Sequence, residues 1–321
     1  MCRAQCVLVV VALYVGVAYS WDLAVSSGDQ LIFYTNNGTE QNRVHFKSRN
    51  LGGLAYDAVH NRMLYVDKQN NNDTICGYNL SSKENQCFIE RSGRNIRSIA
   101  YDPAADKLFF TDAIEKSINM ISLKHGYENI VYLLIKVDDR TPDDITVDSC
   151  ARYIYWSKTE HMQVVDVERA HLDGSGREAL NDEFHGLDII SLTSDPQAQK
   201  IYYINFAKFT VHSFLISADT NGGNKQYYFM KDRSEVKELT VSKDNLFFIS
   251  TTIGERYKSV WRYPKNTWGF ENAKEISKFY TDGSLGLAAN YKIEDQINGV
   301  QNCDSLSNLI PAITEAPVFT P

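Results

Sequence analysis

Short apolar and aromatic runs, separated by polar turns, recur along the chain. The stretch 144–180 shows the pattern in full: Ile145–Asp148 is largely apolar, Tyr153–Ser157 is aromatic, and two further runs flank a turn at Asp173 and Gly174. Asp-Gly between two β-prone runs predicts a hairpin. The stretch therefore predicts four short antiparallel strands. One such unit has two open edges and cannot bury both faces, so it requires copies of itself.

The unit is repeated. Leu54-Ala55-Tyr56-Asp57 ends the first phrase, and equivalent phrases end at the positions Asp102, Asp148, Asp195, Ser242 and Asn290. The steps between these positions are 45, 46, 47, 47 and 48 residues, and an aromatic residue or pair follows each of the first five phrases. A period of about 40–50 residues with four strands per unit is typical of a β-propeller. Six phased units predict an all-β, six-bladed β-propeller.

Both ends of the repeat are incomplete. Residues 22–47 contain strand-like runs without a phrase of their own, and the last phrase, 287–290, has no full unit after it. We expect the N-terminal strands to complete the last blade, because this pairing removes two exposed edges. The predicted organisation is a propeller over residues 21–290, preceded by a signal peptide over 1–20. A largely disordered tail over 291–321 follows, because the pattern is lost and prolines accumulate there.

The aromatic pairs carry a resemblance to a known family. They stand in the segments Leu64-Tyr65-Val66-Asp67, Phe109-Phe110-Thr111-Asp112, Tyr155-Trp156-Ser157-Lys158, Tyr202-Tyr203-Ile204-Asn205 and Phe247-Phe248-Ile249-Ser250. These segments resemble the YWTD motif of LDL-receptor class B repeats, and the likeness covers about residues 22–290. The resemblance implies a YWTD-type propeller, a fold that receptors use to bind protein partners through one face. Lys158, Asn205 and Ser250 depart from the motif and predict relaxed contacts between blades.

The N-terminus predicts secretion. Residues 1–20 carry a single charge, Arg3, then an apolar run, and end in small residues, as a cleaved signal peptide does. No later run has the length of a membrane-spanning helix, so we expect a secreted, extracellular protein with no membrane anchor, acting as a monomer. The chain has 33 Lys and Arg against 40 Asp and Glu, a net charge of −7. This acidic balance argues against a nucleic-acid partner.

Four cysteines follow the predicted signal, and an even count in a secreted chain favours two disulfides. Cys76 and Cys87 flank a short polar turn, and we predict that they pair across it. Cys150 and Cys303 then form the second bond. A zinc site is the alternative, but no CxxC or HxxxH spacing supports it. Three glycosylation sequons begin at Asn37, Asn72 and Asn79, which predicts surface loops at these positions.

No catalytic motif was found: GxSxG, HExxH, GxGxxG and P-loop patterns are absent, and the seven histidines are scattered. The acidic run 138–144 would suit calcium or a cationic group of a partner, whereas the simpler interpretation is a solvated loop. Trp261 and Trp268 fall outside the phased aromatics and would form either a pocket wall or ordinary packing. We expect no enzyme activity, no bound metal and no cofactor.

The starts of the innermost strands line the mouth of a propeller channel. These positions hold a mixed-charge ring, and we predict that it binds a partner or ligand: Arg97, Asp143, Asp144, Lys237 and Glu238. The alternative is that these charges only pair with one another. The primary hypothesis is a secreted binding protein that engages a protein partner through one face. The alternative is an extracellular carrier of a small apolar or zwitterionic ligand of pigment type at the mouth. A calcium-dependent hydrolase ranks third, because only two of the six strand starts offer acids.

Overall fold

The computed structural model describes residues 20–47, 49–91, 93–127, 129–137, 140–159, 167–180, 188–207, 209–298, 300, 303–307 and 309. The predicted signal peptide, apart from Ser20, lies outside these residues, as do Asp138 and Asp139 of the acidic run and the stretch 310–321 of the predicted tail.

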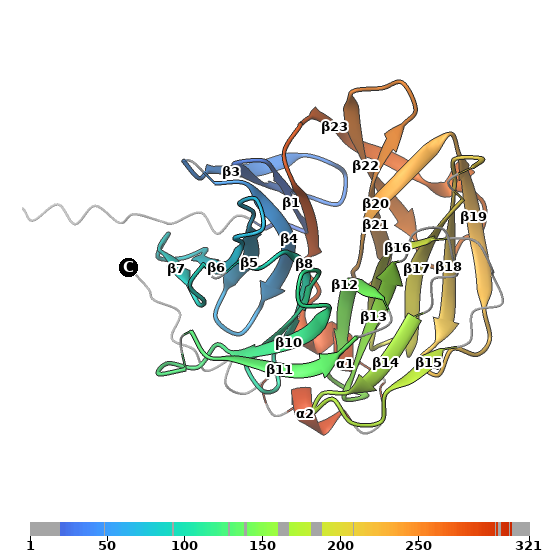
Figure 1. Cartoon of the computed structure of the whole chain (residues 1–321). Helices are drawn as coiled ribbons and strands as arrows, with labels where there is room; N and C mark the ends of the chain where they lie inside the picture. The colour runs from blue at the N-terminus through green and yellow to red at the C-terminus, as the bar shows by residue number, and fades with distance from the viewer. Residues whose placement is uncertain are drawn as a thin grey trace, which may run out of the picture.

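Six four-stranded antiparallel sheets are arranged around a central axis, and Figure 1 shows β4, β8, β12, β16 and β20 nearest to it. The fold is the six-bladed β-propeller that the repeats predicted. Blade 1 consists of β4 (Leu51–Asp57), β5 (Arg62–Asp67), β6 (Thr74–Asn79) and β7 (Asn85–Cys87). Blade 2 consists of β8 (Ile96–Asp102), β9 (Lys107–Asp112), β10 (Ser117–Ser122) and β11 (Val131–Lys136). Blade 3 consists of β12 (Thr141–Asp148), β13 (Tyr153–Thr159), β14 (Val167–His171) and β15 (Glu178–Leu180).

The other three blades complete the ring. Blade 4 consists of β16 (Asp188–Asp195), β17 (Lys200–Ala207), β18 (His212–Asp219) and β19 (Gln226–Asp232). Blade 5 consists of β20 (Ser234–Val241), β21 (Asn245–Thr252), β22 (Tyr257–Pro264) and β23 (Lys274–Tyr280), with the short 3-10 helix η1 (Phe270–Asn272) before β23. Blade 6 combines the last strand with the first three strands: β24 (Leu285–Ala289), β1 (Leu23–Ser27), β2 (Gln30–Tyr34) and β3 (Glu40–His45).

The N-terminal strands close the ring as predicted. β1 pairs antiparallel with β24, from Leu23 opposite Ala289 to Ser27 opposite Leu285. The Asn290 side chain adds a hydrogen bond of 2.9 Å to the Trp21 carbonyl oxygen. Because the first and last segments share one sheet, neither β1 nor β24 is left without a partner strand, and the ring is closed.

The core lies between the blades. Each of six apolar clusters joins side chains of two neighbouring blades, so every sheet buries both faces. The phased aromatics fill these layers: Tyr65, Phe109, Tyr155, Trp156 and Phe247 are all fully buried. The repeated aromatic positions of the sequence therefore correspond to the repeated apolar layers between the blades.

The C-terminal segment lies on the end of the propeller where the innermost strands finish (Figure 1). It contains α1 (Ile293–Ile297) and α2 (Asp304–Ser307). Buried Ile293 and Leu306 pack against Ala58 and Ala104, in the turns after β4 and β8. This segment falls within the 291–321 region of the predicted tail. No helix among the described residues is both long enough and apolar enough to cross a membrane.

Two disulfides are present, in the pairing that the sequence suggested. Cys76 and Cys87 face each other across β6 and β7, with their Cα atoms 3.9 Å apart. Cys150, in the turn after β12, is bonded to Cys303 just before α2, with a sequence separation of 153 residues. The second bond therefore attaches the C-terminal segment to blade 3.

Candidate functional site

The innermost strands become irregular near the end of the propeller where they begin. In five of them the register with the second strand shifts, at the positions Gly53, 97–98, 143–144, Ile190 and Lys237. Such a bulge leaves a residue unpaired and changes the direction of its neighbours. We call this ring of bulges the mouth, the surface around it the mouth face, and the other end of the propeller the opposite face.

The third position of the family motif holds the bulges in place. The Thr111 hydroxyl accepts a hydrogen bond of 3.1 Å from the Ser98 amide and donates one of 2.6 Å to the Asp143 carbonyl oxygen in the next blade. In blade 3 the Ser157 hydroxyl accepts the Asp144 amide at 3.1 Å. A small hydroxyl at this position thus satisfies backbone groups that the bulge removes from the ladder.

Asp144 is the most heavily hydrogen-bonded acid of the mouth. Its Oδ1 accepts from the Ser98 hydroxyl at 2.5 Å and the Ile145 amide at 2.9 Å, and its Oδ2 accepts from the Ser191 hydroxyl at 2.9 Å and the Leu192 amide at 2.7 Å. Burial raises the pKa of this carboxyl, while the four donors oppose that rise. The side chain connects blades 2, 3 and 4 through one carboxyl group.

Glu238 lies across the mouth on β20 and differs from Asp144. It makes no hydrogen bond or ion pair with any described residue. Burial, and then the negative charges of Asp144 and Asp143, hold the pKa of the Glu238 carboxyl well above its usual range. Lys68 and Lys237 oppose this rise in the pKa, and the net effect favours the protonated form of the side chain.

The cations of the mouth are engaged elsewhere or exposed. Lys68 reaches across from the end of β5, where its ammonium group donates to the Ile96 carbonyl oxygen and lies 3.3 Å from Asp73. Burial lowers the pKa of Lys68, and Asp73 opposes this shift. Lys237 is exposed and pairs with Glu235 at 3.3 Å, and Arg97 is also exposed.

A cavity of about 170 Å³ lies inside the mouth, within the channel. Asp144 and Glu238 line it near the mouth, and Tyr56, Tyr101 and Tyr291 line it near the opposite face. Each tyrosine hydroxyl is held there by a turn: Tyr56 contacts Asn61, Tyr101 contacts Asp106, and Tyr291 contacts Asp195, at 3.2, 3.1 and 2.8 Å.

The structure thus separates the five predicted mouth residues into two groups. Asp144 and Glu238 line the cavity, whereas Arg97, Asp143 and Lys237 lie outside its lining. Sequence reasoning missed Lys68 and the three tyrosines. Lys68 directly follows the family segment that ends at Asp67, and Tyr56 and Tyr101 each precede the Asp that ends an inner strand. Both regularities were visible in the repeats, but neither indicates by itself which side chain reaches the channel.

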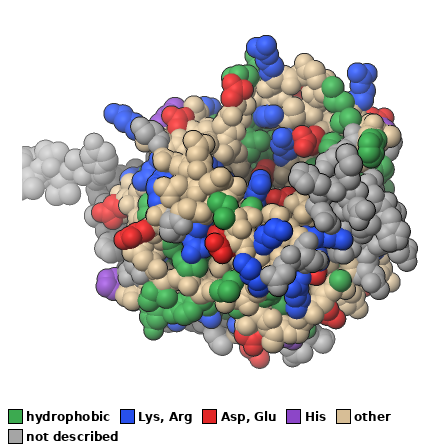
Figure 2. Space-filling view, viewed as in Figure 1, with side chains coloured by type: hydrophobic (Ala, Val, Ile, Leu, Met, Phe, Trp, Pro, Cys, Tyr) green, Lys and Arg blue, Asp and Glu red, His purple; other side chains and the backbone are tan. Residues whose placement is uncertain are grey.

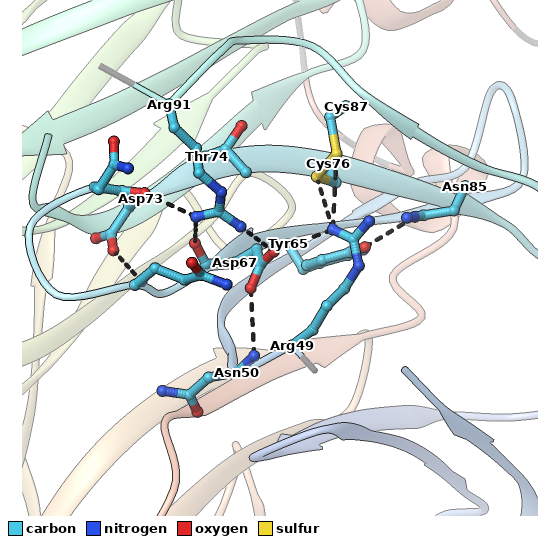
Figure 3. A network of polar contacts seen from close by, with 12 residues as sticks. Arg49, Asn50, Tyr65, Asp67, Asp73, Thr74, Cys76, Asn85, Cys87 and Arg91 are labelled. Carbon is cyan, nitrogen blue, oxygen red and sulfur yellow. Dashed lines mark hydrogen bonds and ion pairs between the residues drawn. A yellow bond between two sulfur atoms is a disulfide. The ribbon is translucent and has the colours of Figure 1, made fainter. Parts of the chain in front are cut away.

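The acid of the motif has a structural role. Asp67 accepts from Arg49 at 3.1 Å, from the Arg91 guanidinium and from the Asn50 amide, as Figure 3 shows. Arg49 also reaches the two sulfur atoms of the Cys76–Cys87 bond, at 3.4 and 3.7 Å. The acid therefore anchors loops of the mouth face to blade 1.

Blade 3 lacks this acid and carries Lys158 in its place. The Lys158 ammonium group lies 2.8 Å from buried Glu168, which also pairs with Arg177 at 3.0 Å. A lysine paired with a glutamate thus stands where blade 1 has an acid paired with arginines. These contacts lie within one blade, so the expectation of relaxed contacts between blades stays a prediction. In blade 5, Ser250 accepts the Trp261 indole N–H at 3.0 Å.

The out-of-phase aromatics of blade 5 are packed. Trp261 stacks against Phe248 and contacts Phe270, while Trp268 stacks on Tyr228 with ring centroids 4.9 Å apart. Lys231 lies over the Trp261 and Phe270 rings at 4.4 and 4.5 Å. These rings already have partners, which favours packing over a pocket wall.

One group of side chains has the composition of a metal site but not its electrostatics. Asp57, His60 and Asp106, in turns of the opposite face, place ligand atoms within 4.8 Å of one another. The Arg62 guanidinium lies between the two acids, 2.5 Å from Asp57 and 3.3 Å from Asp106. A fixed positive charge at this position disfavours a metal ion.

The mouth face exposes large apolar side chains on its loops. They are Ile114 at 48%, Phe209 at 95%, Ile253 at 50%, Tyr257 at 52% and Tyr280 at 51% exposed. The last four lie on blades 4 and 5. Figure 2 shows basic and acidic side chains intermingled on the face in view, with hydrophobic side chains reaching the surface between them. Of the three sequons, only Asn72 lies on the mouth face, on blade 1.

The fold and the motif contacts define a six-bladed β-propeller of the YWTD type. No family model matches the chain. The chain is 25% identical over 254 residues to the protein cueball of Drosophila virilis, which covers 77% of this chain and 39% of that protein. The chain thus spans about two fifths of the curated relatives it matches.

Solved structures share the fold. A chain from a crystal structure of a nidogen–laminin complex superposes with a TM-score of 0.68 and 17% identity, covering 84% of this chain and 98% of that one. A gluconolactonase from Xanthomonas campestris gives a TM-score of 0.55 and 12% identity, covering 82% and 86%. The same architecture thus serves both a protein complex and an enzyme, so the fold alone does not assign an activity.

Proposed function

We propose that the protein is an extracellular, non-enzymatic binding protein that engages a protein partner through its mouth face and acts as a monomer. The observation that carries this proposal is the set of exposed apolar side chains on the mouth loops. Tyr257 and Tyr280 contact each other there, with ring centroids 6.2 Å apart. Exposed aromatic residues beside charged ones are typical of the anchors that dominate protein interfaces.

Four further observations support this proposal. The C-terminal segment covers part of the opposite face, which leaves the mouth face more accessible. Two of the three sequons lie on the opposite face, at Asn37 and Asn79, so glycans there would not obstruct the mouth. Two disulfides suit an extracellular location. The similarity to a propeller solved in a nidogen–laminin complex agrees with a protein partner.

The size of the cavity bears on the carrier alternative. At about 170 Å³ it is smaller than the roughly 300–1,000 Å³ of pockets that enclose drug-sized ligands. A pigment-sized molecule would not fit inside the channel without rearrangement. The cavity therefore favours a protein partner over a pigment carrier, while leaving room for a much smaller ligand.

The test is capture of partners from extracellular fluid by the purified protein, quantified by mass spectrometry. We expect a partner captured by the wild type to be lost with the double variant Tyr257→Ser and Tyr280→Ser. It should be retained by Trp268→Ser, a change of an equally exposed aromatic residue on the opposite face. Loss with Trp268→Ser alone would place the interface on the wrong face. A bound small molecule in native mass spectrometry, with no captured protein, would favour the carrier.

A further inference from the structure

The channel cavity is acidic and its lining includes no base. The charged residues among its lining are Asp144 and Glu238, and none of the lining residues is Lys, Arg or His. The nearby Lys68 and Lys237 are held outside it, by Asp73 with the Ile96 carbonyl oxygen and by Glu235. Both lysines act on Glu238 from outside the lining and lower its pKa, but the cavity itself presents two carboxyl groups, and such a concave site attracts positive charge.

The two carboxyl groups are not equivalent. Four donors saturate both oxygens of Asp144, so this acid serves mainly as a fixed negative charge. Glu238 is half-buried, lines the cavity, and has no hydrogen-bond partner among the described residues. Its carboxyl oxygens are therefore available to a donor that enters the cavity.

The rest of the cavity suits a short alkyl chain. Below the two acids the lining is made of small hydroxyl-bearing and aliphatic residues, among them Thr146, Ser194 and Leu239. The three tyrosines follow at the far end. A volume of about 170 Å³ exceeds that of several water molecules and accommodates a ligand of about five non-hydrogen atoms.

We propose that the channel binds an alkylammonium group, with Glu238 as its hydrogen-bonding counter-ion and Asp144 as a second negative charge. The ammonium group can belong to a free small amine or to a lysine side chain of a protein inserted at the mouth. The chemistry of the site is the same in both cases. The inference goes beyond the proposed function, because a free amine can bind whether or not a protein partner docks on the mouth face.

Binding is coupled to release of a proton. Burial and the neighbouring acids raise the pKa of the Glu238 carboxyl and thereby favour its protonated form. A bound ammonium group favours the ionised form and displaces that proton. Affinity therefore rises as the pH increases from 5 towards 8, the range in which an alkylamine itself stays charged.

The experiment is isothermal titration calorimetry of the whole protein with n-butylamine, with n-butanol as the neutral isostere. We expect saturable, roughly millimolar binding of butylamine and none of butanol. Glu238→Gln should weaken binding about tenfold or more and remove its dependence on pH, because the charged hydrogen bond is lost. Asp244→Asn, at an exposed acid of the opposite face that is outside the cavity lining, should bind like the wild type. Repeating the titration in buffers of different ionisation enthalpy measures the proton released.

Two results would overturn the proposal: no saturable binding of butylamine, or equal binding by the Glu238→Gln variant. Circular dichroism of that variant checks that it is folded, and Gln removes only the charge. Nα-acetyl-lysine amide, which carries a lysine side chain on a blocked backbone, separates the two sources. Its competition with butylamine supports an inserted lysine, and binding of butylamine alone supports a free amine. Failure of partner capture with intact butylamine binding would contradict the proposed function and leave this site standing.

Discussion

At the residue scale, hydrogen-bond donors decide how two acids in one channel behave. Asp144 meets two hydroxyls and two backbone amides, whereas Glu238, in the same low-dielectric surroundings, meets none among the described residues. Burial raises the pKa of both carboxyls; four hydrogen bonds oppose that rise at Asp144, whereas at Glu238 the charges of Asp144 and Asp143 add to it. Identical functional groups in one channel therefore have different chemistry.

Glu238 makes stability depend on pH. Its folded pKa is raised above the ordinary value of 4.5, so the folded state binds more protons than the unfolded state above that pH. Stability from this group is complete at pH below 4.5 and is lost as pH rises towards the folded pKa. We expect Glu238→Gln to match the wild type near pH 4 and to exceed its melting temperature increasingly up to pH 8. Thermal unfolding across that range measures the difference; a gap that shrinks as pH rises would contradict the raised pKa.

Asp144→Asn should destabilise the protein by about 1.5–3 kcal/mol, because an amide cannot accept the hydrogen bonds on both sides of the carboxylate. Its Nδ2 would meet a donor, such as the Leu192 amide, at a buried position. Urea unfolding at neutral pH measures the loss. Asp244→Asn, an exposed acid in a turn of the opposite face, is the control and should change little.

Trp156 is fully buried between blades 2 and 3, where it packs in a cluster with Phe109 and Ile145. Trp156→Ala should cost about 3–5 kcal/mol of unfolding free energy, as large-to-small changes in a core do. Phe209→Ala removes an aromatic ring that is 95% exposed and should cost almost nothing. Chemical denaturation compares the two variants; equal midpoints would contradict the inter-blade packing of Trp156.

At the scale of elements, the strands were predictable and the bulges were not. Anchors recurring at 45 to 48 residues located every innermost strand, because each must bury both faces between neighbours. Strict alternation along β12 would point only one of Asp143 and Asp144 towards the channel, and the bulge between Pro142 and Ile145 determines which one. A bulge depends on hydroxyls such as Thr111 from other strands, so a local pattern does not reveal it.

The two disulfides close loops of very different length. Cys76–Cys87 spans 11 residues and secures β7 to β6, whereas Cys150–Cys303 spans 153 residues and holds the C-terminal segment on blade 3. In the chain-entropy view, replacing the first pair by Ser should cost about 2–3 kcal/mol and the second about 5 kcal/mol. Loss of the second should also make residues near α2 cleavable by protease. Denaturation curves and limited proteolysis test this order; a larger loss from the short loop would contradict it.

At the scale of the whole molecule, the sequence predicted the closed ring because each end of the repeat lacks what the other end supplies. Residues 22–47 contain strand-like runs without a repeated phrase, and residues 287–290 form a repeated phrase without a full unit after it. The two segments lie together in blade 6. The repeat spacing located the channel, because the cavity lining comes from the repeated phrases of all six innermost strands. It did not reveal the volume of the cavity or the contribution of Tyr291 and Gln296, which follow the last strand.

The closure of blade 6 has a consequence for how the protein is made. β1, β2 and β3 leave the ribosome first, yet their inner neighbour, β24, is synthesised some 260 positions later. Blades 1 to 5 can assemble in order during synthesis. Until β24 is made, the edge of β1 that pairs with it stays without a partner strand. Such an edge invites pairing with other chains. The nascent protein should therefore depend on chaperones until the final strand arrives, and a shorter pause before that strand should raise the yield of folded product.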